Sequence, residues 1–492
     1  MKQVFADFAV IGGGGAGLAA ALSAHESGVK HILVLEKSPF LGGNSRMAGG
    51  QLFAVETPDQ FRQGKVMYKD DVFKETMAFH HYSRIKPKIL RRFLENAPET
   101  VAWLESLGFP YTNIEGTNYM VDGLKPFGNF KKVILKMAEL LEAGGHTLLR
   151  RTAVTGLSRS EDGLWHITAE TPEGALSVTA KAVAITTGGF TGNSELMHRY
   201  FPGIYDDNYY FDGLPMDGDG LELARQAGAA MTDYCTLVKE PCHSGTNDRD
   251  TPPMAAQQPA SLWVNALGER FHDETMVRQN VYTNAIAEQP GNLGYALYDG
   301  NVFEHVRTHM DDDEDRPPMP PGMEPGGPGG PGGPPEGDMP MGMPDMEEQM
   351  KRAASKRDGW VYTADTWEEL AEKIGADPAV LRSTVEEYNW DCDAGHDSLF
   401  AKAAKHLVPL RKPPFYAIRF QPILIDTAGP IVIDHNAQVL GDDHRAIPGL
   451  YAAGVITSGW QGYDYYLHGS ALSYSITFGR LAGHRAAEYL NQ

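Results

Sequence analysis

The sequence predicts an α/β fold whose first part is a Rossmann-like, doubly wound domain. Three features near the N-terminus lead to this prediction: a short apolar strand at "DFAVI", an Ala-rich helix at "AGLAAALSAHESG" and a second apolar strand at "HILVLE". Short apolar runs of this kind are typical of parallel strands that are buried on both faces of a sheet. Alanine favours the helix, and Gly28 is placed to end it. A strand, a helix and a strand in this order form a βαβ unit.

A glycine-rich loop, "VIGGGGAG", joins the first strand to the helix and carries Gly12, Gly14 and Gly17 in the G-x-G-x-x-G register. In such a loop the first glycine allows the tight turn, the second lets a diphosphate approach the backbone, and the third lets the helix contact the sheet. The N–H groups at the start of the helix attract an anion. Glu36 ends the second strand, where an acidic side chain accepts hydrogen bonds from ribose hydroxyls. The chain is therefore expected to bind a dinucleotide.

The composition of the chain limits its partners. The chain has 492 residues and a formal net charge of −21, which repels nucleic acid and anionic lipid. Only three Cys occur and none is in a C-x-x-C motif, so disulfide scaffolds, zinc ribbons, iron–sulfur clusters and c-type haem are unsupported, and no metal is expected. No apolar run has the length of a membrane span, and the N-terminus shows no export signal. We expect a cytoplasmic protein without a nucleic-acid partner or a membrane span.

A segment rich in Pro, Gly and Met interrupts the second half of the chain at about residues 311–348. It begins with "DDDEDRPPMP" and continues through "GGPGGPGGPPEGDMPMGMP". Pro and Gly at this density do not build a packed core, so the segment predicts a flexible acidic loop. A mobile lid, with methionines as adaptable apolar contacts, is the alternative. Helical structure is expected again after it, with Asp377 as an N-cap and Pro378 at the first helical position.

A second glycine-rich stretch, "GGNSRMAGG", follows Glu36, and further motifs are "AITTGGF", "DGDGLELARQAGA", "WVNALGERFHDE" and "GLYAAG", the last followed by "LHGSALSYSITFGRLAG". With these motifs the sequence resembles the flavoprotein family of fumarate reductase and succinate dehydrogenase. Relatives in that family include urocanate reductases, ketosteroid dehydrogenases and isoflavonoid reductases such as tetrahydrodaidzein reductase. The resemblance covers most of the chain except the Pro/Gly segment. It implies an FAD-binding domain at 1–235 and 425–492, with an inserted α+β capping domain at 236–424.

The resemblance also implies FAD and the residues around it. Glu36 would bind the adenosine ribose, Val154 would flank the adenine, and the start of the last helix would approach the flavin. Asn44 stands where covalent members of the family carry a His, so FAD is expected to be non-covalent. The implied cofactor residues are Gly12, Gly14, Gly15, Ala16, Gly17, Glu36, Lys37, Gly43, Asn44, Ser45, Gly49, Gly50, Val154, Thr187, Gly188, Asp219, Gly454, Ser470, Ala471 and Leu472.

The resemblance implies transfer of a hydride between flavin N5 and a substrate carbon, while a side chain handles the proton. In fumarate-type members this proton donor is an Arg a few residues beyond an "RF-x-x-E" element, and Arg278 stands there. A guanidinium is a poor acid without special surroundings, so a structural or surface cation is the alternative for Arg278.

The residues that hold a dicarboxylate in fumarate reducers are replaced in this chain. Asp426 in "LIDTAGPIVID" stands at the family's His, and Tyr466 in "DYYLHGSALS" stands at its Arg. Losing one cation and adding one anion would repel a dianion by several kcal/mol in a dry pocket. Fumarate and succinate are therefore disfavoured as substrates, and Asp426 becomes an acid–base group or an acceptor for a substrate hydroxyl.

An aromatic cluster in "GWQGYDYYLHGSALS" offers flat apolar surface with polar tips, which suits a ring-shaped substrate. Its members are Trp460, Tyr463, Tyr465 and Tyr466. Tyr466 is expected to be the acid or the electrophile of the reaction, with Asp464 and His468 as its partners. Packing within the core is the alternative for each aromatic residue. His243 is a weaker substrate candidate, for which a structural role is the alternative.

These features predict an FAD-dependent oxidoreductase that reduces a cyclic, largely uncharged substrate such as an isoflavonoid. A 3-ketosteroid dehydrogenase or enone reductase needs similar groups, and a fumarate- or urocanate-type acrylate reductase is a further alternative. A flavin oxidase that passes electrons to oxygen or a carrier, and a non-enzymatic flavoprotein subunit, also stay open. NAD(P)H and an electron-donor protein are the candidate sources of electrons.

Overall fold

A computed structural model describes residues 2–115, 118–121, 130–205, 210–211, 213–243, 258–276, 279–309, 346–356, 359–467 and 469–492. The chain forms two compact units. Unit 1 comprises Met1–Pro202, Gly213–Val238 and Asp426–Gln492, and unit 2 comprises Gly203–Asp212 and Lys239–Ile425. Unit 2 is thus inserted into unit 1, and strands β11 (Thr236–His243) and β15 (Phe415–Ala428) contain two of the boundaries between them.

Unit 1 is built on an eight-stranded sheet with the strand order β16-β17-β9-β1-β2-β6, and β8 joins it at β9 and carries β7. β1 (Lys2–Ile11) pairs in parallel with β2 (Ile32–Leu35) and with β9 (Gly174–Ile185). β6 (Thr147–Leu149) and β17 (Ala446–Ala452) extend the parallel arrangement on either side. The predicted βαβ unit is therefore confirmed, with α1 (Gly15–Glu26) as its helix.

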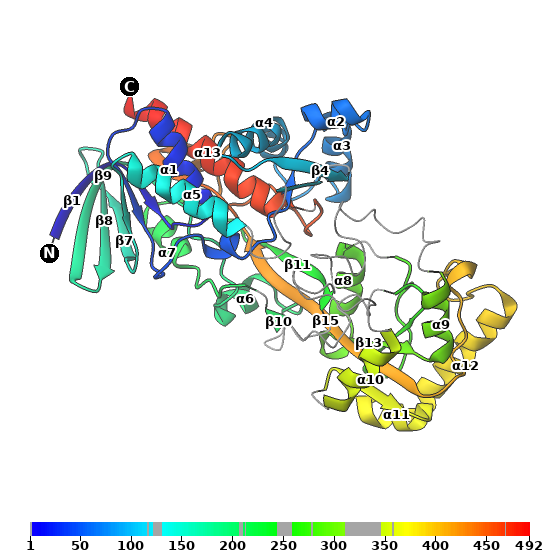
Figure 1. The fold of residues 1–492 in the computed structure, drawn as a ribbon. Helices are drawn as coiled ribbons and strands as arrows, with labels where there is room; N and C mark the ends of the chain where they lie inside the picture. The colour runs from blue at the N-terminus through cyan, green and yellow to red at the C-terminus, as the bar shows by residue number, and fades with distance from the viewer. Residues whose placement is uncertain are drawn as a thin grey trace. The chain divides into compact units, whose positions relative to one another are not determined.

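Helices α1, α5 (Phe130–Ala143) and α13 (Ser470–Leu490) pack together against this sheet (Figure 1). Two glycines let α13 approach α1 closely. A Cβ atom at Gly479 would lie 2.3 Å from the carbonyl oxygen of Ala16, and one at Gly483 would lie 2.2 Å from that of Ala20. Because no side chain fits at either position, this contact fixes the two helices, and hence their N-terminal ends, against each other.

The remaining described elements of unit 1 include the other strands of this sheet, a small three-stranded sheet and five further helices. They are β3 (Leu52–Phe53), α2 (Pro58–Gln63), α3 (Lys69–Phe79), α4 (Pro87–Ser106), β4 (Tyr111–Glu115), β5 (Asn118–Val121), β7 (Ala153–Arg159), β8 (Trp165–Thr171), α6 (Ser194–Tyr200), α7 (Asp219–Gln226) and β16 (Gln438–Leu440).

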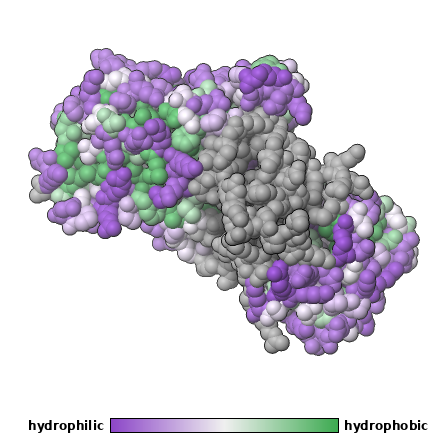
Figure 2. Space-filling view, viewed as in Figure 1, coloured by the Kyte–Doolittle hydropathy of each residue, from purple (hydrophilic) through white to green (hydrophobic). Residues whose placement is uncertain are grey.

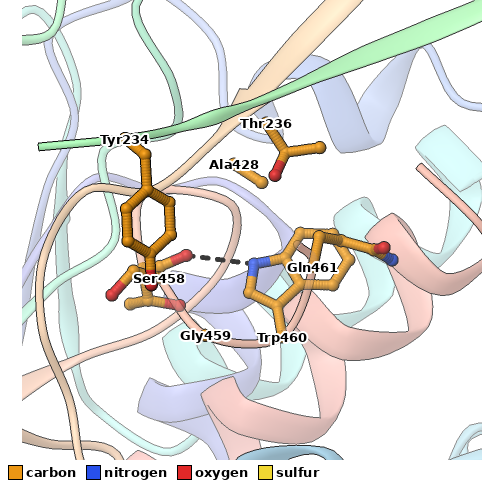
Figure 3. A pocket seen from close by; sticks show the side chains of 8 residues that line it. Tyr234, Thr236, Ala428, Ser458, Gly459, Trp460 and Gln461 are labelled. Carbon is orange, nitrogen blue, oxygen red and sulfur yellow. Dashed lines mark hydrogen bonds between the residues drawn. The ribbon is translucent and has the colours of Figure 1, made fainter. Parts of the chain in front are cut away.

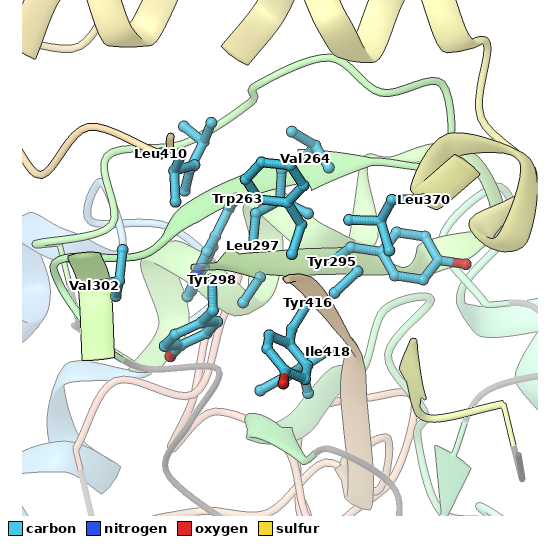
Figure 4. Close-up of a cluster of buried hydrophobic side chains, with 14 of the residues drawn as sticks. Trp263, Val264, Tyr295, Leu297, Tyr298, Val302, Leu370, Leu410, Tyr416 and Ile418 are labelled. Carbon is cyan, nitrogen blue, oxygen red and sulfur yellow. The ribbon is translucent and has the colours of Figure 1, made fainter. Parts of the chain in front are cut away.

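Unit 2 is an α+β unit around a six-stranded sheet in which β15 is the central strand, because β10, β11, β13 and β14 all pair with it. Apolar side chains of the strands form the core, and Figure 4 shows Trp263, Leu297 and Tyr416 within it. The other elements are β10 (Tyr210–Phe211), β12 (Leu262–Asn265), α8 (Gln279–Ala287), β13 (Gly294–Tyr298), α9 (Gly300–Thr308), α10 (Met346–Lys356), β14 (Val361–Ala364), α11 (Trp367–Ile374) and α12 (Pro378–Ala394).

Unit 2 contains a buried ionic network that involves the "GERFHDE" motif. The Arg270 guanidinium donates to Glu274 at 2.9 Å and to Asp397 at 2.8 Å, and the Lys402 ammonium lies 3.2 Å from Glu274. The side chains of Glu274, Asp397 and Lys402 are fully shielded from solvent and that of Arg270 nearly so. Two positive and two negative charges therefore neutralise each other inside unit 2.

The start of α12 is as expected, because the Asp377 side chain accepts from the backbone N–H groups of Ala379 and Val380, with Pro378 at the first helical position. Of the segment predicted as a loop at about 311–348, the structure describes only residues 346–348, which form the start of a helix. Helix α10 begins at Met346, where the last proline has been passed and where Met350 can bury its side chain in the core of unit 2. Residues 310–345 lie outside the described part of the chain.

Hydrophilic side chains cover much of the described surface on the face shown in Figure 2, with smaller hydrophobic areas between them. In the described ranges, no helix combines the length and the apolar character that a membrane crossing requires.

Candidate active site

The glycine-rich loop after β1 has the geometry that its sequence predicts. Gly12 has a φ of +101°, and a Cβ atom there would lie 2.6 Å from the Thr186 carbonyl oxygen. A Cβ atom at Gly17 would lie only 2.0 Å from the Gly12 carbonyl oxygen. At Gly14, by contrast, the nearest atom to such a Cβ is 3.9 Å away. The protein itself fills the space beside the first and third glycines and leaves the space beside the second to a ligand.

Beside this opening, the start of α1 has no side-chain cap, since its N-cap residue is Gly14. The buried Glu36 carboxylate lies at the end of β2, where Oε2 accepts from the Gly13 N–H at 2.8 Å and Oε1 accepts from the Ser38 N–H at 2.8 Å. Uncapped N–H groups attract a phosphate, and a carboxylate with this fixed orientation suits a ribose. The Lys37 ammonium binds Asp217 at 2.6 Å and Asp219 at 2.8 Å. Lys37 and Asp219, both predicted to contact the cofactor, therefore contact each other.

A second wall of the site comes from the "TTGGF" loop. The Thr187 hydroxyl is buried and has no hydrogen-bond partner among the described residues, which points to a partner outside the protein. Met216 lies over two glycines of the site, because Cβ atoms at Gly43 and Gly188 would be 3.6 Å from its Cε and 3.5 Å from its Sδ. Sequence reasoning missed Met216, since nothing in its local pattern marks it.

Asn44 and Asp426 meet in this region. Asn44 Nδ2 donates to Asp426 Oδ2 at 3.1 Å, and Asn44 Oδ1 accepts from the Leu214 N–H at 2.8 Å. Burial raises the pKa of Asp426 to about 6, although the hydrogen bond from Asn44 opposes this shift. The carboxylate predicted to face a substrate instead contacts a predicted cofactor residue.

Tyr466 is half-buried and is held by an aromatic partner. Its ring stacks on Phe79, at the end of α3, with 4.2 Å between ring centroids and 21° between ring planes. The buried His80 ring stands edge-on to it at 6.2 Å. Gln461 accepts from the Tyr466 N–H at 3.4 Å and donates to the Ser470 hydroxyl at 3.2 Å. Phe79, His80 and Gln461 therefore join Tyr466 to the start of α13, and sequence reasoning had singled out none of the three.

His80 is neutral at pH 7. Burial lowers its pKa to about 4, and the neighbouring Gln461 side chain only partly opposes this. Its Nδ1 accepts from the Tyr463 N–H at 3.3 Å, which a protonated ring could not do. The ring beside Tyr466 is thus an uncharged imidazole rather than a cation.

The segment after His80 is strained and supports the same loop. His81, Tyr82 and Arg84 have φ values of +54°, +52° and +63°, a conformation that costs a non-glycine residue about 1 kcal/mol or more. The Arg84 guanidinium lies 4.4 Å from the ring centroid of Tyr463 and 5.0 Å from that of Tyr234. The contact of Arg84 with Tyr463 places this segment beside the loop that carries Tyr466.

Two of the predicted substrate aromatics have structural contacts. The Trp460 ring is buried and stacks on Tyr474 with 4.4 Å between centroids, and its indole N–H donates to the Thr457 carbonyl at 3.0 Å. Figure 3 shows Trp460 in a pocket that leaves no room for a water molecule. The buried Tyr465 hydroxyl accepts from the Ala471 N–H at 3.2 Å and so caps α13. Both placements favour packing, the alternative stated for these residues, while Tyr463 is 51% exposed.

The other predicted residues divide into described and undescribed ones. Those described in unit 1 are Gly15 and Ala16 in α1, Gly43 and Ser45 in the short 3-10 helix Gly43–Arg46, Gly49 and Gly50 after it, Val154 in β7, Gly454 after β17, Leu472 in α13, and the buried Asp464. Arg278 and His468 lie outside the described residues, as does the side chain of His243, the last residue of β11. Among the described residues no cluster could hold a metal ion.

A doubly wound sheet with a glycine loop open at Gly14, a second glycine loop beside it and a buried unpartnered hydroxyl fits a flavin dinucleotide. The FAD binding domain family matches residues 7–472, so the chain belongs to this family. Its place is in the fumarate reductase-like branch, and it is an FAD-dependent oxidoreductase.

Among its curated relatives, NADH:fumarate oxidoreductase from Klebsiella pneumoniae (strain 342) is 29% identical over 98% of this chain, which spans only 48% of that protein. Vinyl phenol reductase from Lactiplantibacillus plantarum is 30% identical over 99% of this chain and 97% of its own length. Urocanate reductase from Eggerthella lenta is 28% identical over 98% of this chain and 74% of its own length.

Two solved structures show the fold. A flavocytochrome c3 fumarate reductase in an open conformation has a TM-score of 0.71 and 24% identity, covering 99% of this chain and 79% of its own. The 3-ketosteroid delta1-dehydrogenase of Sterolibacterium denitrificans has a TM-score of 0.74 and 20% identity, covering 98% of this chain and 99% of its own. The expected FAD-binding domain with an inserted capping domain is thereby confirmed.

Replacing Gly14 with Ala tests the approach of FAD to the loop. The new methyl group contacts no protein atom closer than 3.9 Å, so the melting temperature of the apoprotein is expected to stay unchanged. The methyl group would crowd the ligand by about 1–3 kcal/mol, which raises the Kd for FAD roughly ten- to a hundredfold. Gly17→Ala is the contrast, because its 2.0 Å clash is within the protein and should lower the melting temperature. FAD titration followed by fluorescence measures the Kd of each variant, and thermal unfolding measures its melting temperature. Wild-type affinity for FAD in Gly14→Ala would contradict the assignment of this loop to FAD binding.

Proposed function

We propose that the chain reduces a carbon–carbon double bond conjugated to the ring of a largely uncharged substrate, with Tyr466 as the proton donor. Bound FAD, once reduced by NAD(P)H or a donor protein, would supply the hydride and return to its oxidised form. One hydride and one proton add across the double bond, and Tyr466 regains its proton from solvent. The observation that carries the proposal is the character of the groups that replace the dicarboxylate clamp. Tyr466 is a phenol stacked on Phe79, and Asp426 is a buried acid.

The neighbourhood of Tyr466 supports this proposal. Phe79 holds one face of the phenol, and Gln461 holds its backbone. His80 adds a ring edge without a charge at pH 7. A ring substrate gains contact area from such surroundings, whereas a dianion would find no balancing cation in this group of side chains.

The substrate class follows from these contacts and from the relatives. Vinyl phenol reductase, named for a phenol, is 30% identical over almost its whole length. A phenol conjugated to the double bond can release electron density to the carbon that takes the proton from Tyr466, which leaves a quinone-methide carbon able to accept the hydride. We therefore place phenolic styrenes and unsaturated isoflavonoids first and enone steroids second.

A second candidate function is the reduction of an aryl acrylate, which carries one carboxylate. It is favoured by Arg84, whose guanidinium lies against Tyr463 and Tyr234 and, within the described ranges, pairs with no carboxylate. Urocanate reductase is among the relatives.

The proposed substrates can be separated by one experiment. The FAD of the holoenzyme is reduced by light without oxygen and then mixed with 4-vinylphenol, a hydroxylated isoflavone, an enone steroid, 4-hydroxycinnamate or fumarate. The return of the oxidised flavin absorbance gives each rate. We expect the uncharged ring compounds to be fastest and fumarate to be slowest. Fastest reoxidation by fumarate would overturn the proposal, and fastest reoxidation by 4-hydroxycinnamate would replace it with the second candidate.

Arg84→Gln tests the second candidate. If Arg84 binds the carboxylate, the variant should raise the KM for 4-hydroxycinnamate about fivefold, the effect typical of an exposed ion pair, and leave that for 4-vinylphenol unchanged. Arg91→Gln is the control, because Arg91 also lies over an aromatic ring, Phe73, but away from Tyr466. Equal KM changes for both substrates would show that Arg84 supports the packing of the loop and does not bind the carboxylate.

We also propose that FAD is held without a covalent bond, and that the protein is cytoplasmic. Asn44, at the position of the family's attachment His, is engaged by Asp426 and Leu214. NAD(P)H or a donor protein would supply the electrons, and the NADH-dependent Klebsiella relative supports the former.

A further inference from the structure

Three backbone segments of unit 1 meet at the Asp426 carboxylate, and a fourth is joined to them through Asn44. Its Oδ2 accepts from Asn44 Nδ2 at 3.1 Å, and its Oδ1 accepts from the Thr427 N–H at 2.9 Å. A Cβ atom at Gly189 would lie 2.3 Å from the same Oδ1. On the other side of the Asn44 carboxamide, the Leu214 N–H donates to Asn44 Oδ1 at 2.8 Å. The carboxylate is 6% exposed and occupied on both oxygens, which does not suit the acid–base role expected from the sequence.

These bonds fix the orientation of the Asn44 carboxamide. An ionised carboxylate only accepts hydrogen bonds and a backbone N–H only donates them. The amide nitrogen of Asn44 must therefore face Asp426, and its oxygen must face Leu214. A flipped carboxamide would put an oxygen against a carboxylate and a nitrogen against an N–H, and would lose both bonds.

The oriented side chain lies next to the dinucleotide loop. Gly42 forms a parallel bridge with Gly14, and a Cβ atom at Gly43 would lie 3.8 Å from Gly14 Cα. Asn44 follows these two residues directly. The carboxylate of Asp426 is thus one side chain away from the backbone that receives the cofactor.

The charge of Asp426 has no balancing partner among the described residues, where no Lys or Arg forms an ion pair with it. The pKa of about 6, raised by burial, leaves the carboxylate mostly ionised at pH 7. A buried negative charge without a counter-ion opposes the gain of further negative charge nearby.

We propose that Asp426 is a positioning residue for bound FAD: it orients the Asn44 carboxamide and, through its charge, keeps the reduction potential of the flavin low. The inference depends on FAD binding alone, so a failure of the proposed substrate class leaves it unaffected, and the test below uses no substrate.

The test compares the reduction potentials of the FAD-loaded wild type and Asp426→Asn at pH 7, measured by equilibration with a reference dye. Removing the charge should raise the ratio of reduced to oxidised flavin about tenfold at a fixed solution potential, which is a shift of about 30 mV for a two-electron couple. Asn44→Ser keeps the charge and removes the oriented amide, so it should weaken FAD binding with a smaller change in potential.

Asp434→Asn is the matched control, because Asp434 accepts from the N–H groups of Asn436 and Gln438 in a turn apart from the glycine loops. Its potential should equal that of the wild type. An unchanged potential in Asp426→Asn, or an equal shift in the control, overturns the proposal. If Asp426→Asn does not retain FAD, the same measurement on Asp426→Ser decides: a raised potential supports the proposal and an unchanged one overturns it.

Discussion

Tyr466→Phe is expected to lower kcat for the ring substrate by about a hundredfold or more, the effect of losing a general acid. The change removes only the hydroxyl group. Stacking on Phe79, at 4.2 Å, and the backbone bond to Gln461 do not depend on that group, so FAD content and melting temperature should match those of the wild type. Anaerobic stopped-flow measurement of flavin reoxidation under saturating substrate gives the rate of the affected step directly.

The control for this variant is Tyr68→Phe, which removes the hydroxyl of a tyrosine that is 54% exposed at the start of α3. It should leave kcat and KM unchanged. If Tyr466→Phe instead keeps the wild-type kcat and raises only KM, Tyr466 is a binding surface and the proton comes from another group.

Arg270→Met should destabilise unit 2 by about 3–5 kcal/mol, as expected when one partner of a buried ion pair is removed. It leaves Glu274 and Asp397 without their guanidinium partner, and only Lys402 to balance two buried carboxylates. Chemical denaturation followed by circular dichroism measures the free energy of unfolding. The exposed pair of Arg382 with Glu368 provides the control, since Arg382→Met should change that energy by about 1 kcal/mol or less.

The same network makes unit 2 sensitive to acid. Burial alone would raise the pKa values of Asp397 and Glu274. The hydrogen bonds and charge of Arg270 lower the pKa of Asp397, and the charges and hydrogen bonds of Lys402 and Arg270 lower that of Glu274, so both pKa values fall below their ordinary range. A lowered pKa stabilises the fold above the ordinary carboxyl value of about 4, and that stability is lost as the pH falls below it. Arg270→Met should therefore flatten the acid side of the stability profile. A steep acid transition in the variant would show that other carboxylates control it.

The parts of the fold and site that could be predicted from the sequence depend on local rules. The βαβ unit follows from apolar periodicity, and Gly12 and Gly17 follow from the fixed geometry of the turn they occupy. Glu36 could be found because the end of the second strand is at a known spacing from the glycines.

The surroundings of Tyr466 could not be predicted in this way. His80 contacts Tyr463, which lies 383 residues further along the sequence. No local sequence pattern predicts such a contact. The left-handed backbone at His81 and Tyr82 carries no glycine to mark it. Tyr465 looks like a substrate residue by composition, and only its bond to Ala471 identifies it as a helix cap.

The close contact of α1 with α13 has a consequence for the order in which the protein matures. The helix that follows the dinucleotide loop is synthesised long before the helix whose Gly479 and Gly483 pack against it. Strand β17, which closes the parallel sheet beside β9, is also late. The two helices of this pair are therefore made at widely separated times, and their close contact can form only after α13 has been synthesised.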